Sequence, residues 1–136
     1  MKTLHVSLSV KSIPDSVSYY STLFGRKPDV LKPEFAKWWL DDPKVNFALN
    51  AGSGNPGLNH LGIEVDDEAD LTPYYERAQA AGTFAEEGDT ECCYAQSTKG
   101  WASDPQNVSW ELFKTTEYLH DAPTQPKQAC PTDCCA

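Results

Sequence analysis

Hydrophobic and polar residues alternate strictly near the start of the chain, which predicts a β-strand. In the segment LHVSLSV, Val6, Leu8 and Val10 share one face, and His5 shares the other face with two serines. The apolar face is expected to meet a helix. The polar face is expected to line a different, polar environment.

A helix and three short strands are predicted after this first strand. Ser12 and Asp15 form a capping-box-like start, Pro14 lies in the first turn, and Gly25 closes the segment SVSYYSTLF. The strand candidates that follow are residues 29–32, 35–40 and 45–50. The predicted order of elements is therefore β-α-β-β-β.

The same order returns after a Gly-rich linker, AGSGNPG at residues 51–57. LHVSLSV resembles NHLGIEV, which matches His5 with His60, and VNFALN resembles VSWELF, which matches Ala48 with Glu111. A second helix is predicted at about residues 69–81. Residues 1–114 are thus predicted to form one domain, with modules at 3–50 and 58–114, followed by a mobile Cys-containing tail at 115–136.

Composition narrows the class of partner. The chain has 136 residues, five cysteines and a formal net charge of -9, which argues against a nucleic-acid partner. It shows no signal-peptide pattern and no run long enough to cross a membrane, so a cytoplasmic protein with no membrane partner is expected. In a reducing compartment the cysteines are expected to serve as thiols for metal, metalloid or redox chemistry. A small molecule or a metal is the expected partner.

Two β-α-β-β-β modules follow one another: HV opens the first and HLG opens the second, and DP followed by VSWELF closes the second. This arrangement resembles the vicinal oxygen chelate superfamily. Glyoxalase I, extradiol dioxygenases and bleomycin-resistance proteins belong to it. The resemblance covers residues 3–114 and implies an α+β fold, in which both modules build a cup-shaped mixed sheet with helices outside. It also implies metal ligands on the first strand of each module and on a last strand, here His5, His60 and Glu111. Ala48 replaces the carboxylate of the first module, so a four-ligand site is not expected.

The chemistry of these three residues supports the same assignment. Strand alternation places His5, His60 and Glu111 away from the apolar residues that should meet the helices. Two imidazoles and one carboxylate form the facial triad of non-haem Fe(II) oxygenases, which leaves positions open for dioxygen and substrate. The alternative is that each histidine only makes hydrogen bonds inside the cup.

Two adjacent cysteines, Cys92 and Cys93, raise a separate possibility. Trivalent arsenic exchanges oxygen ligands for thiolates, and a monosubstituted organoarsenical has two exchangeable positions. Two thiols therefore saturate it and leave its carbon-arsenic bond exposed. Neighbouring side chains of a regular strand point to opposite faces, so the pair is predicted to lie in a loop with residues 85–91, AEEGDTE. Two small buried side chains on a strand are the alternative.

The triad together with a CC pair before the penultimate strand resembles a narrower family, the Fe(II)-dependent carbon-arsenic lyases, also known as cadmium-induced or glyoxalase-like proteins. HLGIEV, ECCYAQSTKGWASDPQNVSWELF and the Cys-rich tail carry this resemblance. It implies dioxygen-dependent cleavage of trivalent methyl or aromatic arsenicals to inorganic arsenite, by a monomer or homodimer. Fe(II) would bind to His5, His60 and Glu111, and arsenic to Cys92 and Cys93.

Two other functions remain open at this level. An extradiol ring-cleaving dioxygenase would use the same triad, but it normally needs further acid-base residues and gives no reason for the thiol pair. A non-catalytic arsenic or cadmium-binding protein would use the thiols but gives no reason for the triad. The tail cysteines, Cys130, Cys134 and Cys135, fit capture of arsenite or a soft metal as well as a scavenging tail without a catalytic role.

Overall fold

Two modules of like order follow one another in the computed structural model, which describes residues 2–52, 54–91 and 95–118. The first module contains β1 (Thr3–Val10), α1 (Ile13–Phe24), β2 (Val30–Lys32), β3 (Phe35–Asp41) and β4 (Lys44–Ala51). The second contains β5 (Gly57–Glu64), a short 3-10 helix η1 (Glu68–Asp70), α2 (Leu71–Ala80), β6 (Phe84–Glu91), β7 (Ala95–Ser103) and β8 (Ser109–Tyr118). The predicted α+β class and the tandem module order are confirmed.

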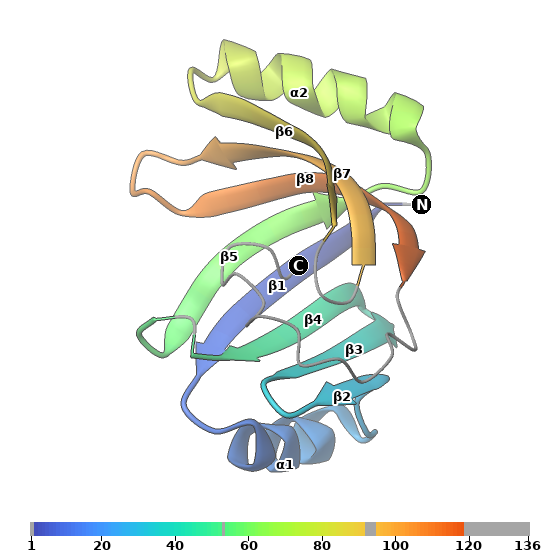
Figure 1. Ribbon diagram of the computed structural model, residues 1–136, viewed down its shortest axis with the longest axis vertical. Helices are drawn as coiled ribbons and strands as arrows, with labels where there is room; N and C mark the ends of the chain where they lie inside the picture. The colour runs from blue at the N-terminus through green and yellow to red at the C-terminus, as the bar shows by residue number, and fades with distance from the viewer. Residues whose placement is uncertain (1, 53, 92–94, 119–136) are drawn as a thin grey trace.

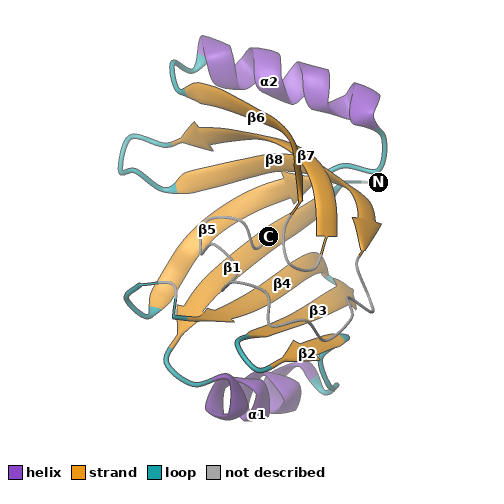
Figure 2. Ribbon diagram, in the orientation of Figure 1, coloured by secondary structure: helices purple, strands orange, loops and turns teal. Residues whose placement is uncertain are grey.

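All strands belong to one eight-stranded sheet, in the order β2-β3-β4-β1-β5-β8-β7-β6. β1 pairs with β4 in parallel and with β5 in antiparallel orientation, and β5 pairs with β8 in parallel orientation. The two modules therefore meet along β1 and β5. Figure 1 shows the sheet curving around a concave side, with α1 at the bottom of the view, below β2, and α2 at the top, above β6. Figure 2 shows that both helices lie outside this curved layer of strands.

The alternation in β1 separates a helix-packing face from a polar interior. Val6, Leu8 and Val10 pack against the cluster built around Trp38 under α1. His5 lies on the opposite face and is 0% exposed. The face that carries His5 is thus enclosed by the curvature of the sheet, and we call this concave inner face the cup.

The helix boundaries follow the local signals in the sequence. The Ser12 hydroxyl accepts a hydrogen bond from the backbone N–H of Asp15 at 3.2 Å, and Gly25 ends α1 with a φ of 71°. The second helix, predicted at about residues 69–81, begins with the 3-10 turn and ends at Ala80. Neither helix in the described part of the chain has the length and apolar character needed to cross a membrane.

Two predicted boundaries in the second module differ from the structure. Residues 85–91 were predicted as a loop but belong to the strand β6. β6 is an edge strand, so it needs no apolar alternation, and a bulge between Glu86 and Gly88 accommodates the glycine at a φ of 75°. β8 continues past Lys114 to Tyr118, because its last residues still pair with β7.

Candidate functional site

The three predicted metal ligands come together on the inner face of the sheet. His5 lies on β1, His60 on β5 and Glu111 on β8, and they are 0%, 5% and 0% exposed. The Nε2 atoms of the two histidines are 3.1 Å apart, and Nε2 of His60 lies 3.5 Å from Oε2 of Glu111. The meeting of both modules along β1 and β5 produces this cluster from residues far apart in the sequence.

Neighbouring acceptors fix the tautomer of each imidazole. Nδ1 of His5 lies 3.1 Å from the backbone carbonyl of Asn46, which only accepts, so this nitrogen carries the proton. Nδ1 of His60 lies 2.7 Å from Oδ1 of Asn59, whose Nδ2 already donates to the hydroxyl of Ser9. Both neutral rings therefore turn a bare Nε2 lone pair toward the same point. Such an arrangement calls for a cation between them.

Glu111 is buried with little to compensate its charge. Neither carboxylate oxygen makes a hydrogen bond with any described residue, and the nearest ammonium, Nζ of Lys99, lies 3.7 Å from Oε2. Burial raises the pKa of Glu111 to about 7, against the opposing effect of Lys99 and Lys37. Burial lowers the pKa of His60 to about 4, with Lys99 and Lys37 acting in the same direction.

The donor set fits a divalent transition metal. Two donors bound at right angles to one metal at about 2.1 Å are about 3.0 Å apart, close to the separations of His60 from His5 and from Glu111. The Nδ1 hydrogen bonds to Asn46 and Asn59 are the outer contacts that orient metal-bound histidines. In the described ranges no three His, Cys, Asp or Glu side chains already converge on one metal position. The contacts among the three side chains are pairwise, and Nζ of Lys99 lies 3.7 Å from the same carboxylate oxygen that His60 faces.

A glycine between the ligands makes their approach possible. Gly62 on β5 pairs with His5 on one side and with Glu111 on the other. A Cβ at this position would lie 2.7 Å from the backbone oxygen of Glu111 and 3.3 Å from Cβ of His5. The absence of a side chain therefore leaves the space in which these two side chains face each other.

Aromatic rings enclose the two imidazoles. Phe113 meets His5 edge-on at a centroid distance of 5.3 Å, and Trp101 meets His60 at 5.2 Å. Phe113 is 1% exposed. These rings restrict water around the candidate ligands and lower the local dielectric, which strengthens electrostatic interactions there.

Two buried lysines of the cup were not identified from the sequence. Lys37 and Lys99 are 5% and 1% exposed, and Nζ of Lys37 lies 5.5 Å from the ring of Phe35 and 5.9 Å from the ring of Trp39. The spacing that matches Trp39 with Trp101 also matches Lys37 with Lys99, so the internal repeat carried a signal for them. Together they make the surroundings of the triad electropositive.

All five cysteines lie outside the residues that the structure describes. Cys92 and Cys93 fall between β6 and β7 in the sequence but outside the described residues, as do Cys130, Cys134 and Cys135. Their predicted placement and roles stay predictions. Glu64, the last residue of β5, is half-buried and accepts a hydrogen bond from Thr115 at 2.8 Å.

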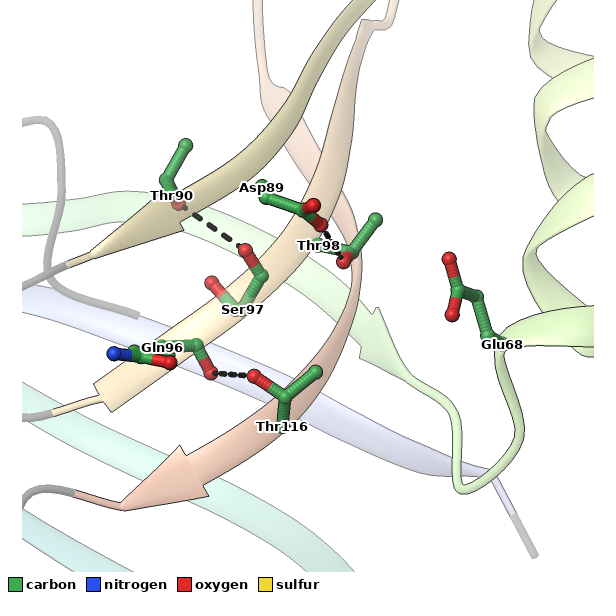
Figure 3. A pocket seen from close by; sticks show the side chains of 7 residues that line it. All are labelled: Glu68, Asp89, Thr90, Gln96, Ser97, Thr98 and Thr116. Carbon is green, nitrogen blue, oxygen red and sulfur yellow. Dashed lines mark hydrogen bonds between the residues drawn. The ribbon is translucent and has the colours of Figure 1, made fainter.

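Two hollows in the described surface differ in their relation to the triad. One, of about 470 Å³, is lined by carboxylate, amide and hydroxyl groups from η1 and from β6, β7 and β8. Figure 3 shows Glu68 facing these strands, with Asp89 and Thr98 joined by a hydrogen bond. The other, of about 420 Å³, includes Thr3, Trp39 and Glu64 in its lining. Thr3 and Trp39 lie on the inner face with His5, so this second hollow adjoins the cup.

Comparison with known proteins places this chain in a family. Residues 2–112 match the Glyoxalase/Bleomycin resistance protein/Dioxygenase superfamily, and the chain belongs to this family. A glyoxalase/bleomycin resistance protein/dioxygenase superfamily member from Vibrio splendidus 12B01 has a similar structure, with a TM-score of 0.58 at 19% identity, covering 84% of this chain and 99% of that one. That similarity concerns the fold.

Two sequence relatives are more similar. The trivalent organoarsenical cleaving enzyme of Bacillus sp. (strain MD1) is 36% identical over 135 residues, which covers 96% of this chain and 83% of that protein. The probable trivalent organoarsenical cleaving enzyme of Bacillus subtilis (strain 168) is 39% identical over 118 residues, covering 85% of this chain and 81% of that protein. The suspected resemblance to this branch of the superfamily is therefore confirmed.

Proposed function

We propose that this chain cleaves the carbon-arsenic bond of trivalent organoarsenicals in a reaction that depends on Fe(II) and dioxygen and releases inorganic arsenite. The relatives at 36% and 39% identity are named as enzymes that cleave trivalent organoarsenicals. The observation that carries the proposal is the triad, in which two bare imidazole nitrogens face a buried carboxylate whose oxygens make no hydrogen bond with a described residue. Neutral histidines and a carboxylate form the ligand set of mononuclear non-haem iron.

His5, His60 and Glu111 would hold the metal. When bound, Fe(II) supplies a redox-active centre with positions open for dioxygen and substrate. The backbone carbonyl of Asn46 and the side chain of Asn59 keep the two Nε2 atoms directed inward. The metal charge would replace Lys99 as the main partner of the Glu111 carboxylate.

Cys92 and Cys93 are proposed to bind the arsenic. Each thiol would replace one hydroxyl of R–As(OH)₂ and release one water, so two As–O bonds become two As–S bonds. The bound arsenic then keeps its carbon substituent and its trivalent state. During cleavage of a methyl substituent the C–As bond would break and dioxygen would be the oxidant, with one oxygen atom ending in the carbonyl of the oxidised organic fragment and the other in a hydroxyl on arsenic. Two water molecules would then replace the two thiols, so that both As–S bonds break, the thiols regain their protons, and arsenic leaves as arsenite. The thiols position the substrate, which lowers the entropic cost of bringing it to the cup.

Arsenic speciation with defined metals tests the reaction. Metal-free protein is loaded anaerobically with Fe(II) or Zn(II) and mixed with trivalent methylarsenite, with and without dioxygen. We expect inorganic arsenite only from the Fe(II) form in the presence of dioxygen, because zinc has no redox chemistry. Comparable arsenite from the zinc form, or under nitrogen, would exclude an oxidative cleavage.

Substitutions separate the metal site from the substrate thiols. Alanine at His5, His60 or Glu111 should lower iron affinity by more than about tenfold and abolish turnover, since even outer contacts of a metal contribute that much. Serine at Cys92 or Cys93 should leave the iron content unchanged, weaken methylarsenite binding and stop cleavage.

A carboxylate near the triad supplies the control for these variants. Glu64→Gln removes the half-buried carboxylate that accepts from Thr115, and it should retain iron and activity. Full iron content in all three triad variants would refute the metal assignment. Full activity in both serine variants would refute the thiol assignment.

A further inference from the structure

One buried amide in the cup makes no side-chain hydrogen bond within the described part of the chain. Asn46 on β4 is 0% exposed, and neither Oδ1 nor Nδ2 of its side chain makes a hydrogen bond with any described residue. Buried polar groups are nearly always paired, because an unmade hydrogen bond in the interior costs the full desolvation of the group. An unpaired buried amide of this kind does not stabilise the free protein, so it points to a role in binding.

The position of Asn46 is next to the candidate metal ligands. It pairs with His5 on β1 and with Trp39 on β3, and residues directly paired across a sheet share one face. Its backbone carbonyl accepts from Nδ1 of His5 at 3.1 Å. The Asn46 carboxamide also lies close enough to the His5 imidazole to raise its pKa, although neither carboxamide atom has the geometry of a hydrogen bond to the ring. The unpaired carboxamide is therefore inside the cup, on the first-module side of His5.

Another buried amide on the same face, and the exposed amide of Asn59, are paired within the protein. Asn50 lies on the same strand and face as Asn46, is 8% exposed, and donates from Nδ2 to the Ser7 hydroxyl at 3.3 Å. Asn59 donates to Ser9 at 3.0 Å and accepts from His60 at 2.7 Å. The unpaired state of Asn46 is thus not a general property of amides in the cup.

The chemistry of a carboxamide defines what it can bind. Nδ2 donates hydrogen bonds and Oδ1 accepts them, and both functions are unused in Asn46. A matching ligand must offer an acceptor and a donor close together, as a hydroxyl group does. Dioxygen accepts but does not donate, and a methyl group does neither. Trp39, the partner of Asn46 on β3, also lines the hollow of about 420 Å³ beside the cup, so this hollow lies one strand away from the amide.

We propose that the Asn46 side chain is the hydrogen-bonding subsite for an arsenic-bound hydroxyl group beside His5. The proposal rests on the proposed function, because the hydroxyl belongs either to the organoarsenical substrate or to the arsenite product. With two thiols on arsenic, substrate R–As(III) carries no hydroxyl, whereas arsenite carries at least one. Asn46 would then bind the arsenite product, and also any substrate that is held by a single thiol and keeps one hydroxyl.

Paired substitutions test the subsite without turnover. Fe(II)-loaded wild type, Asn46→Leu and Asn50→Leu are titrated under nitrogen with inorganic arsenite and with methylarsenite, using calorimetry. Leucine has the same number of side-chain heavy atoms and the same branching as asparagine, but it makes no hydrogen bond. In Asn46→Leu, arsenite affinity should fall about tenfold, iron content should not change, and the melting temperature of the metal-free protein should be equal or higher.

The control reverses this pattern. Asn50→Leu removes the partner of Ser7, so its melting temperature should fall while arsenite affinity stays at the wild-type value. A larger loss for arsenite than for methylarsenite in Asn46→Leu identifies the product hydroxyl, and equal losses identify the substrate hydroxyl as well.

Three results would overturn the proposal. Wild-type affinity for both arsenicals in Asn46→Leu removes the subsite but leaves the proposed function intact. Loss of iron or of thermal stability in Asn46→Leu assigns the amide to metal binding or to folding. No binding of either arsenical by the wild type overturns the proposed function and this subsite together.

Discussion

Individual side chains in the cup are held in protonation states that suit metal binding. His5 and His60 each donate from Nδ1, to Asn46 and Asn59, so each has a free lone pair on Nε2. The pKa of His5 lies well below its usual value, because of burial first and then because of His60 and Lys37. The metal-free cup thus keeps both imidazoles neutral in neutral solution.

Opposite pKa shifts give the metal-free protein a pH dependence that one substitution can isolate. The pKa of Glu111 is raised from 4.5 to about 7, so between these pH values the folded state binds a proton that the unfolded state has lost. This proton stabilises the folded state at low pH, and the stabilisation is lost as pH rises from about 4.5 to 7. The pKa of His60 is lowered from 6.5 to about 4, so its contribution to the unfolding free energy is lost as pH falls from about 6.5 to 4. In wild type these two effects oppose each other.

Glu111→Gln should remove only the first effect. We expect the unfolding free energy of the metal-free wild type, relative to that of Glu111→Gln, to fall by about 2 to 3 kcal/mol between pH 5 and pH 8. Urea unfolding of both proteins at several pH values measures this difference. A difference that stays constant over this range would show that Glu111 ionises normally in the folded protein.

At the level of elements, β5 is the strand that brings the candidate ligands together. It lies between β1 and β8, carries His60, and through Gly62 leaves His5 and Glu111 facing each other. In the central strand β1 every second side chain is buried, and the sequence alternates clearly. The edge strand β6 shows no apolar alternation, and among the described strands it pairs only with β7.

Gly62→Ala tests this role of β5. A Cβ at 2.7 Å from the backbone oxygen of Glu111 forces β5 and β8 apart, so we expect a loss of about 1 to 3 kcal/mol in unfolding free energy. Iron affinity should fall at least about tenfold, because the ligand positions shift. Denaturant unfolding and anaerobic iron titration measure the two effects.

Gly100→Ala provides the control on the other face of the sheet. Its Cβ would lie 2.6 Å from the ring of Phe84 and 3.0 Å from Tyr75, both packed together between α2 and the strands. This variant should lose stability but retain iron affinity. An equal loss of iron affinity in both variants would mean that general destabilisation, not ligand spacing, causes the effect.

At the scale of the whole molecule, the modules are related but unequal. Ser7 pairs with Ala48 in the first module as Gly62 pairs with Glu111 in the second, which agrees with the repeat in the sequence. The first module thus offers one histidine, and the second offers a histidine and the carboxylate. The unequal contribution leaves the first-module side of the site to neutral and cationic groups such as Asn46 and Lys37.

Truncations test where the folded unit ends. A chain that stops after Tyr118 keeps all of β8 and should unfold within about 0.5 kcal/mol of the full chain. A chain that stops after Lys114 loses the Thr115 hydrogen bond to Glu64 and the last pairs with β7. It should lose at least about 1 to 2 kcal/mol. Equal stability of the two truncated chains, measured by thermal and urea unfolding, would place the end of the domain at residue 114.

Periodicity and repetition were enough to predict the modules, the helix caps and the inner face of the strands. His5 and His60 stand at matching positions of two strands, and Ser12 and Gly25 are local signals that act within a few residues. Such features depend on near neighbours along the chain, so the sequence contains them directly. Cys92 and Cys93 remain a prediction.

The tertiary structure decided what depends on pairing between distant strands. In the second module Trp101 pairs with Glu111. In the first module its repeat equivalent, Trp39, pairs with Asn46, whose own equivalent in the second module is Ser109 rather than Glu111. The longer turn before β8 shifts this register, and the sequence repeat does not reveal the shift. Burial of the lysines and the unpaired amide of Asn46 likewise follow from curvature and packing. These are properties of distant residues brought together, which local sequence patterns do not specify.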